Sequence, residues 1–481
     1  MRHRNNILII VLLILTSYSS LAMSKEKRSK EKPNVLFIFA DDQTFDTLNS
    51  LGNKEIETPH LDRLVRNGTT FTHAYNMGSW TGAVCVASRH MLNTGRYLWH
   101  ARTASQQCSQ EVKAGRFWSE HMKKAGYETY MSGKWHVRAK ANSTFQNVVH
   151  VRPGMPNQTS KGYNRPLDGK PDTWKPWDKK NKGYWKGGKH WSEVLGDDAE
   201  TFLAKASQSE KPFFMYLAFN APHDPRQSPK KYVDKYPLKN IAMPKNFLPE
   251  YPYNEAMGSG RTLRDERLAP FPRTPHSVKV NRQEYYAIIT HMDVQIGRIL
   301  DALEKSGKAK NTYIFFTADH GLAVGRHGLM GKQNMFDHSV RVPFIVNGPD
   351  IGKNKKIDGA IYLQDIMPTT LELAGVAKPK HVQFKSILPL LKGERTQNYT
   401  SLYGAYTNVQ RSVTVGDYKL ILYPKIKKVL LFNLKNDSLE MHNLAEKTGS
   451  QPIIKHLMKE LRKLQKETGD QLDLSKDFPK L

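Results

Sequence analysis

The chain has 481 residues, of which 39% are hydrophobic and 25% are charged, a composition typical of a folded globular protein rather than a low-complexity chain. This length allows a large buried core and more than one structural unit. The formal net charge of +28 is unusual and predicts attraction to polyanions, namely nucleic acid, anionic membrane surfaces or sulfated and uronic glycans. Charge alone does not choose among these partners.

An apolar run near the N-terminus follows the basic residues Arg2 and Arg4 and ends in small residues. This pattern predicts a secretory signal peptide over residues 1–23 and a secreted or periplasmic protein. A retained membrane anchor is the alternative, because the run is near the lower length limit for crossing a bilayer. No cysteine follows the run, so a lipoprotein anchor is not supported. In an oxidising compartment, a disulfide between Cys85 and Cys108 is an alternative to two free thiols.

Four apolar runs further along the chain end in side chains that carry chemistry, and we expect each run to be a buried strand. In chain order, these runs lead into Asp41 and Asp42, Lys134 and His136, His223, and Asp319 and His320. Helical patterns over residues 58–68, 116–126 and 282–307 lie between or beside the runs. The alternation predicts an α/β fold with a large, mostly parallel sheet between layers of helices. Because ligands bind beyond the carboxyl ends of such strands, we expect the four strand ends to converge.

From about residue 152 to residue 190 the pattern becomes irregular, with Gly, Pro and Lys interleaved with aromatic residues. Trp174, Trp177 and Trp185 are candidates for stacking on sugar rings, with the lysines pairing with anionic substituents. An irregular insertion whose tryptophans pack inward is an equally favoured alternative.

Near residue 396 the pattern changes to short alternating runs followed by a Lys-rich helix. We therefore predict a catalytic domain over residues 33–395 and a smaller C-terminal subdomain, of antiparallel sheet plus helix, over residues 396–481. Arg411, in the stretch YGAYTNVQRSV, is a further candidate for binding sugar.

The adjacent carboxylates of Asp41 and Asp42 would repel each other unless a cation lies between them. Asp319 adds a third hard oxygen donor, and such a set favours Ca²⁺ or Mg²⁺ over Zn²⁺. His320 is an unusual ligand for Ca²⁺ and keeps Mn²⁺ or Zn²⁺ open as minor options. A helix-capping pair is the alternative for Asp41 and Asp42 taken alone.

Several motifs then occur in a fixed order along most of the chain: PNVLFIFADDQ, CVASR, TGR, GKWH, APH, ADHG and GKQNMFDHSVRVPFIVNGP. Together they resemble the type I, formylglycine-dependent sulfatases of the alkaline phosphatase superfamily. The core signature of that family, Cys-x-Pro/Ala-x-Arg, is matched by Cys85, Ala87 and Arg89. The resemblance implies an alkaline phosphatase-like fold and hydrolysis of sulfate esters, as in a bacterial polysaccharide or glycan sulfatase.

The resemblance further implies that a maturation enzyme oxidises Cys85 to formylglycine (3-oxoalanine), whose hydrate carries two hydroxyl groups. One hydroxyl attacks the sulfur of the sulfate ester and expels the alcohol. Deprotonation of the second hydroxyl then releases sulfate and restores the aldehyde. A serine would perform only the first half of this cycle, because a sulfated serine has no internal route for releasing sulfate.

The same resemblance assigns roles to the other residues. The metal ligands it implies for Ca²⁺, or less favourably for Mg²⁺ or Mn²⁺, are Asp41, Asp42, Asp319, His320 and the modified Cys85. Arg89 would steady the hydrated aldehyde, and Lys332 would hold a sulfate oxygen. Lys134 and His136 would contact the sulfate and assist breakdown of the intermediate. His223 would protonate the leaving alcohol, although His136 is an alternative for that role.

Two positions depart from the commonest family pattern. Ala87 occupies the place where proline is most usual, and His320 occupies a place where many members have Asn. The expected substrate is a sulfated glycan or oligosaccharide. A phosphonate or phosphodiester hydrolase of the same superfamily is the alternative enzyme, and a polyanion-binding protein is the alternative without catalysis. We expect no nucleic-acid partner, since only the charge favours one and no nucleic-acid-binding motif is recognised.

Overall fold

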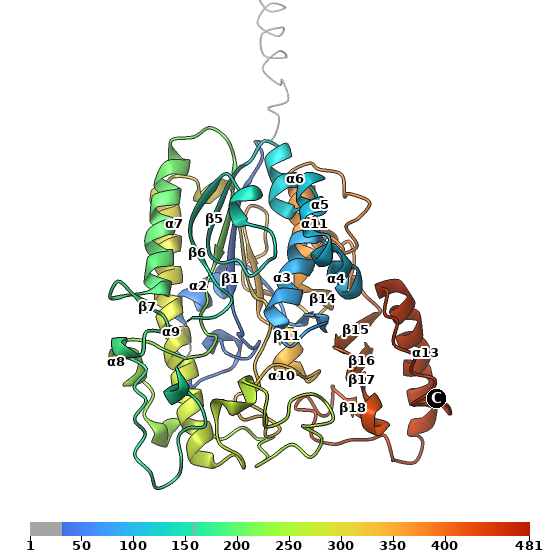
Figure 1. Ribbon diagram of the computed structural model, residues 1–481. Coiled ribbons are helices and arrows are strands. Elements are labelled where there is room, and N and C mark those ends of the chain that lie inside the picture. The colour runs from blue at the N-terminus through green and yellow to red at the C-terminus, as the bar shows by residue number, and fades with distance from the viewer. Residues whose placement is uncertain (1–30, 157–158) are drawn as a thin grey trace, which may run out of the picture. The chain divides into compact units, whose positions relative to one another are not determined.

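The computed structural model describes residues 31–156 and 159–481, and its central feature is an eight-stranded sheet (Figure 1). The strand order is β13-β2-β12-β10-β1-β9-β5-β6, and the five strands from β10 to β6 are parallel. In this order the bounds are Lys355–Ile357, Thr69–Phe71, Phe344–Asn347, Thr312–Ala318, Asn34–Ala40, Phe213–Ala218, Glu128–Lys134 and Asn147–Arg152. β12 is antiparallel to β10 and to β2. The predicted α/β fold with a large, mostly parallel sheet is confirmed.

Helices cover both faces of this sheet, which Figure 1 shows as layers on either side of β1. One layer contains α2 (Pro59–Asn67), α7 (Trp191–Ser207) and α9 (Pro275–Lys305), and both α2 and α7 pack on α9. The other layer contains α3 (Val84–Thr94), α6 (Trp118–Lys124) and α11 (Ile366–Leu373). The three helical patterns expected from the sequence correspond to α2, α6 and α9.

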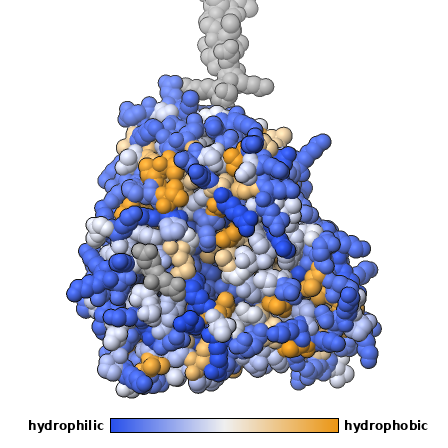
Figure 2. All heavy atoms as spheres, in the orientation of Figure 1, coloured by the Kyte–Doolittle hydropathy of each residue, from blue (hydrophilic) through white to orange (hydrophobic). Residues whose placement is uncertain are grey.

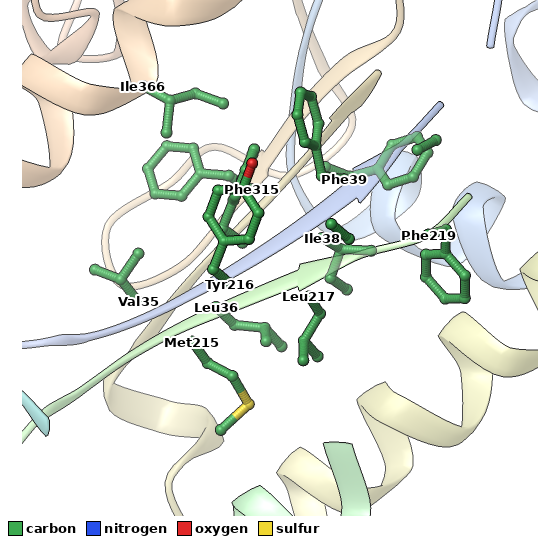
Figure 3. Packing of buried hydrophobic residues seen from close by; sticks show 14 of the residues in the cluster. Val35, Leu36, Ile38, Phe39, Met215, Tyr216, Leu217, Phe219, Phe315 and Ile366 are labelled. Atoms are coloured by element: carbon green, nitrogen blue, oxygen red, sulfur yellow. The ribbon is translucent and has the colours of Figure 1, made fainter. Parts of the chain in front are cut away.

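The double cover explains the apolar sequence of β1, all seven residues of which are buried. Figure 3 shows side chains of β1 and β9 packed together in this core. On one face, the ring of Trp118 from α6 lies 5.3 Å from the ring of Phe37 and 4.6 Å from that of Phe214. The indole Nε1 of Trp118 donates a hydrogen bond to the Thr370 hydroxyl at 2.7 Å, so its polar atom is satisfied inside the core.

A second sheet forms the C-terminal part of the protein, in the order β18-β17-β16-β15-β4. The bounds are Lys428–Asn433, Tyr418–Tyr423, Gln410–Val415, Ser401–Tyr406 and Gly78–Ser79. The helix α13 (Ser450–Thr468) packs on it. The predicted smaller subdomain of sheet plus helix is therefore present. Its fifth strand, β4, belongs to the segment that leads into α3, so this sheet directly supports the start of that helix.

Shorter elements complete the fold. They are α4 (Leu98–Gln106), α5 (Cys108–Lys113), α8 (Lys230–Val233), α10 (Asp337–Val340), α12 (Leu388–Leu391), β3 (Ala74–Tyr75), β7 (Trp185–Lys186), β8 (Lys189–His190), β11 (Arg341–Val342) and β14 (Ile361–Tyr362). Residues 34–481 form one compact unit, and the predicted boundary near residue 396, between α12 and β15, stays a prediction.

The predicted signal peptide, and its alternative as a membrane anchor, lie outside the described residues. Within residues 31–156 and 159–481, none of the helices has an apolar stretch long enough for a bilayer crossing. Figure 2 shows that hydrophilic residues dominate one face of the molecule, with apolar residues in small separate groups.

Candidate active site

Two neighbouring parallel strands bring carboxylates together beyond their carboxyl ends. β1 and β10 are in register with Ala40 beside Ala318, so the residues that follow, Asp41 and Asp319, are neighbours. The backbone N–H of Asp42 donates to Oδ1 of Asp319 at 3.1 Å. All three aspartates are fully buried. The convergence expected from the sequence is therefore observed for these strand ends.

Cys85, the second residue of α3, faces these carboxylates. Its Sγ donates to Oδ1 of Asp41 at 3.2 Å and lies 3.8 Å from Oδ1 of Asp42. The Lys332 ammonium donates to the same sulfur at 3.3 Å and to Oδ1 of Asp42 at 2.6 Å. Cys85 and Cys108 are both free thiols, so the disulfide considered as an alternative is not formed.

Two further buried cations neutralise the remaining carboxylates. Nε of Arg89, one turn beyond Cys85 in α3, donates to Oδ2 of Asp319 at 2.9 Å, and Nη1 donates to the carbonyl of Lys134 at 2.7 Å. The Lys134 ammonium is paired with Asp41. Because a single hydrogen-bonded network includes the ends of β10, β5 and β1, the positions of these side chains are set by the sheet itself.

Burial and charge shift the ionisation of this centre in opposite directions. Burial, reinforced by the other carboxylates, raises the pKa of Asp41 and of Asp42 to about 6. Burial also acts on Asp319, but Arg89 and the two lysines outweigh it and hold the pKa of Asp319 well below its usual range. Burial and the nearby carboxylates raise the pKa of the Cys85 thiol well above its ordinary value. An unmodified thiol here stays protonated at neutral pH and is a poor nucleophile.

One set of side chains has the spacing of a metal site. Ligand atoms of Asp41, Asp42, Cys85 and His223 all lie within 4.8 Å of one another. Nε2 of His223 is 3.6 Å from Oδ2 of Asp42. Buried carboxylate oxygens that repel one another are the donors that a hard divalent cation such as Ca²⁺ prefers. The residues therefore fit the cation that the sequence led us to expect.

The predicted ligands Asp319 and His320 differ in their surroundings. Asp319 is paired with Arg89, as described above. Nε2 of His320 is buried and has no hydrogen-bond partner among the described residues, although Nδ1 lies 3.2 Å from the Gly321 carbonyl. Burial lowers the pKa of His320 to about 4, which leaves the imidazole neutral and able to donate a lone pair. This orphaned nitrogen supports its place in the ligand set.

His136 lies two residues beyond the end of β5 in a left-handed backbone conformation, with φ of +51°. Its ring lies against Gly154, where a Cβ atom would come within 2.2 Å of the imidazole. Glycine is therefore required there by close contact. Burial, together with the charges of Lys134 and Arg89, lowers the pKa of His136 to about 2. The imidazole is consequently neutral, and its buried Nδ1 has no hydrogen-bond partner among the described residues.

The sequence analysis missed the residues that orient His223. Asp224 lies with Oδ1 at 3.0 Å from Nδ1 of His223, and Arg264 donates to the other Asp224 oxygen at 3.1 Å. The Tyr184 hydroxyl lies 2.8 Å from the carbonyl of Asn220 and 2.9 Å from that of His223. In the sequence, only the position of Asp224 directly after His223 pointed to such a contact. Tyr184 and Arg264 lie in loops far from His223 along the chain.

The four candidate sugar-binding residues differ in their exposure and in their partners. Trp174 is 3% exposed, whereas Trp177 and Trp185 are half-buried, with lysine ammonium groups at 5.4 Å and 5.3 Å from their ring centroids. Arg411 is buried, and its Nε and Nη2 donate to Asp470 at 2.6 Å and 2.8 Å. None of the four has a hydrogen bond or ion pair with the strand-end residues in the described part of the chain. Their proposed role in binding sugar stays a prediction.

Comparison with known proteins places this geometry in a family. The family model described as Sulfatase matches residues 33–376. The chain belongs to the sulfatase family. A second model, N-sulphoglucosamine sulphohydrolase, C-terminal, matches residues 325–467 of this sulfatase. The family and the enzymatic activity expected from the sequence, hydrolysis of sulfuric esters, are thus confirmed.

Individual relatives span nearly the whole sulfatase chain. An arylsulfatase of Clostridium perfringens is 29% identical over 484 residues, which cover 93% of this chain and 98% of the relative. A structure solved in complex with its substrate, D-glucosamine-2-N,6-O-disulfate, is 22% identical, has a TM-score of 0.70, and covers 92% of this chain and 99% of that one. A phosphonate monoester hydrolase from Silicibacter pomeroyi is 19% identical with a TM-score of 0.71, covering 91% and 96%. The two structures support the fold.

Proposed function

We propose that this sulfatase removes sulfate from a sulfated carbohydrate and that its nucleophile is formylglycine made from Cys85. The observation that carries the proposal is the position of Sγ of Cys85, 3.2 Å from Asp41 and 3.3 Å from Lys332. A group at this position has carboxylates on one side, which would bind a cation. It also has the Lys332 ammonium, which would bind the anionic sulfate group. Attack on a sulfate ester needs both.

Three observations support a carbohydrate as substrate. The net charge of +28 favours a polyanionic partner. The C-terminal part of the chain matches a model named for N-sulphoglucosamine sulphohydrolase, and a protein of similar fold was solved with a disulfated glucosamine as its substrate. A sulfated glycan is a substrate that agrees with all of these observations.

We assign the metal to Asp41, Asp42, Asp319, His320 and the modified residue 85, and we leave His223, whose Nε2 lies 3.6 Å from Oδ2 of Asp42, outside this set. Ca²⁺ is the ion we favour, because oxygen donors predominate. When bound, the cation would supply positive charge beside the nucleophile and the sulfate.

The chain's own residues perform the remaining tasks. Lys332 and Lys134 hold sulfate oxygens as negative charge develops on them. Arg89 fixes Asp319 through the 2.9 Å contact, which keeps the carboxylate in place. His223 is positioned to deliver a proton to the leaving oxygen, and Asp224 orients its ring from 3.0 Å. His136, whose buried Nδ1 has no hydrogen-bond partner among the described residues, would contact the sulfate group as a neutral imidazole.

The maturation and location of the enzyme complete the proposal. A maturation enzyme must reach Cys85 before the fold buries it, because the side chain is 3% exposed in the folded protein. We retain the signal peptide over residues 1–23, a secreted or periplasmic location, and a boundary between the catalytic domain and the C-terminal subdomain at residue 396.

The experiment combines mass spectrometry of the peptide containing residue 85 with turnover assays. We expect an aldehyde in place of the thiol, and release of sulfate from an aryl sulfate and from sulfated monosaccharides. Cys85→Ala should abolish turnover, whereas Cys108→Ala, which changes the other free cysteine, should retain it. Undiminished turnover by Cys85→Ala contradicts the proposal.

A second candidate function is hydrolysis of phosphonate monoesters or phosphodiesters, because a phosphonate monoester hydrolase shares this fold with a TM-score of 0.71. The same enzyme preparation should be assayed with an aryl phosphonate monoester and an aryl phosphodiester beside the sulfated substrates. A larger kcat/KM for the phosphorus esters would replace the sulfatase proposal with this one.

A further inference from the structure

A cavity of about 600 Å³ lies beside the C-terminal sheet, between α4, the turn joining β15 to β16, and the segment after α13. Its lining includes Trp80, Trp99, Arg102, Thr407, Asn408 and Arg411. This volume lies within the range of about 300–1,000 Å³ typical of ligand pockets. Of the lining residues, only Arg411 was considered as a binding residue from the sequence.

The wall of the cavity is held rigidly by a buried polar network. Arg411 donates to both oxygens of Asp470, and its Nη1 donates to the Thr407 carbonyl at 2.7 Å. The Tyr403 hydroxyl donates to Asp470 at 2.9 Å and accepts from Nε1 of Trp99 at 2.8 Å. The guanidinium of Arg411 also lies 5.0 Å from the Trp99 ring centroid. The network orients the Trp99 ring without a ligand, so the site is preorganised.

The groups that face the cavity match an anionic sugar. Trp80 and Trp99 offer aromatic surface for the C–H face of a pyranose ring, and Asn408 and Thr407 offer partners for hydroxyl groups. Asp470 neutralises Arg411, whereas Arg102 is exposed and has no ion pair in the described part of the chain. Its guanidinium is therefore available for a sulfate or carboxylate group.

The segment of residues 79–82 contacts both the cavity and the residues near Cys85. Trp80 lies five positions before Cys85, and its ring centroid is 6.2 Å from that of His90, in α3. On the cavity side, the backbone N–H of Thr407 donates to the Ser79 carbonyl at 2.7 Å.

The same segment also contacts the residue that follows Lys332. Nε2 of Gln333, the residue after Lys332, donates to the Gly82 carbonyl at 3.1 Å. Gln410, at the start of β16, donates to the Gln333 carbonyl at 2.8 Å. The short segment of residues 79–82 is therefore hydrogen-bonded both to Thr407 of the cavity lining and to Gln333, the residue that follows Lys332.

We propose that this cavity is a second sugar subsite, which binds an anionic residue of the same glycan chain as the residue whose sulfate ester lies at Cys85. The inference rests on the proposed function, since it requires a glycan chain whose sulfate ester is bound at Cys85. It also requires that the enzyme prefer oligosaccharides to monosaccharides.

The test compares Arg102→Gln with the wild-type enzyme on three substrates: an aryl sulfate, D-glucosamine-2-N,6-O-disulfate, and a heparin-derived tetrasaccharide. Loss of one charge-assisted hydrogen bond should raise KM for the tetrasaccharide about tenfold. The kcat for the tetrasaccharide and both constants for the two smaller substrates should stay within twofold. Trp80→Ala should give the same pattern through loss of the aromatic surface. Arg66→Gln, which changes an exposed arginine of α2, is the matched control.

Calorimetry separates the subsite from the proposed function, because it needs no turnover. The tetrasaccharide should bind Cys85→Ala, and the added change Arg102→Gln should weaken that binding about tenfold. Equal binding by both proteins, or no binding by either, overturns the subsite even if aryl sulfate is hydrolysed. Weakened binding without hydrolysis of any sulfate ester would retain the cavity as a glycan site and overturn the proposed function. Equal KM changes for small and large substrates would also contradict the subsite.

Discussion

Lysines occur in two contrasting regions of this sulfatase. Lys134 and Lys332 are buried in the catalytic centre, each paired with an aspartate that follows β1. In the stretch of residues 170–189, lysines such as Lys175 and Lys182 are exposed. The comparison teaches that a buried lysine is marked by the counter-charge that the fold brings to it, rather than by local composition.

The physical difference is the cost of removing an ammonium group from water. Burial of a charged group costs several kcal/mol, which is tolerated only when an opposite charge and hydrogen bonds are in place. In the centre, Asp41 and Asp42 provide that compensation. In the stretch of residues 170–189, Lys175 and Lys182 remain exposed to water and have no ion pair in the described part of the chain.

The largest effect that tests this comparison is expected from the same change made in both regions. In metal-free buffer at pH 8, Lys332→Met should lower the free energy of unfolding by about 3–5 kcal/mol, because Asp42 is left buried and unpaired. In the presence of Ca²⁺ it should also reduce kcat for an aryl sulfate by about 10²-fold or more. Urea unfolding and steady-state assays measure the two effects.

Lys182→Met is the matched control and should change the free energy of unfolding by less than about 0.5 kcal/mol. If both variants lose similar stability, burial and pairing do not distinguish the two regions.

Addition of metal gives the next largest effect. Because the carboxylates of Asp41, Asp42 and Asp319 are buried together, Ca²⁺ should stabilise the fold by about 2.7 kcal/mol at a free concentration 100 times its Kd. Calorimetric titration and urea unfolding, with and without EDTA, measure the affinity and this gain. Asp42→Asn should weaken Ca²⁺ binding and shrink the gain. Stability that is unchanged by Ca²⁺ at any concentration would contradict the metal site.

Asp365, a buried carboxylate outside the centre, allows the cost of burying a charge to be measured through the pH dependence of stability. Asp365 is buried and accepts hydrogen bonds from the Tyr399 hydroxyl at 2.7 Å and from the backbone N–H of Lys385 at 3.0 Å, but burial prevails and raises its pKa to about 7. The folded protein therefore binds this proton more tightly than the unfolded chain, for which the pKa is 3.8. Its contribution to stability is present below about pH 4 and is lost as the pH rises to about 7.

Asp365→Asn removes this titration. The quantity to compare is the urea midpoint of the variant minus that of the wild type, both measured in EDTA. This difference should be more positive at pH 8 than at pH 5. The exposed Asp350→Asn should follow the wild type at both pH values. If the difference in urea midpoint between Asp365→Asn and the wild type is the same at pH 5 and pH 8, the Asp365 carboxyl is not held protonated.

The sequence allowed prediction of the catalytic centre because its residues follow buried strands. Asp41, Asp319 and Lys134 each end an apolar run, and the parallel order of β10, β1 and β5 brings those ends together. The proposed nucleophile, Cys85, was predicted from a short motif, and the start of α3 brings its sulfur within 3.2 Å of Asp41.

The parts that escaped prediction depend on contacts between loops. Tyr184 and Arg264, which support the loop of His223, lie in stretches without helical or strand periodicity. The same lack of pattern left the tryptophans open between two interpretations. In the structure Trp174 is buried, whereas Trp177 and Trp185 are half-buried against lysines.

The smallest effect is expected from the exposed lysines. A triple variant of Lys175, Lys180 and Lys182 to Gln should leave the free energy of unfolding and aryl-sulfate turnover nearly unchanged. Against a heparin-derived tetrasaccharide at low salt, its KM should rise about two- to threefold, because three positive charges no longer attract the polyanion. Above about 0.5 M salt the difference should disappear, since screening then acts within a few ångströms.

Lys353, Lys355 and Lys356, which are exposed at β13, allow the same loss of charge elsewhere on the protein. If the stretch of residues 170–189 attracts the glycan through its own position, this second triple variant should raise KM by a smaller factor. Equal increases would mean that the overall charge of +28 acts without regard to position. The exposed lysines would then differ from those of the centre in a second respect, since their number and not their placement would determine their effect.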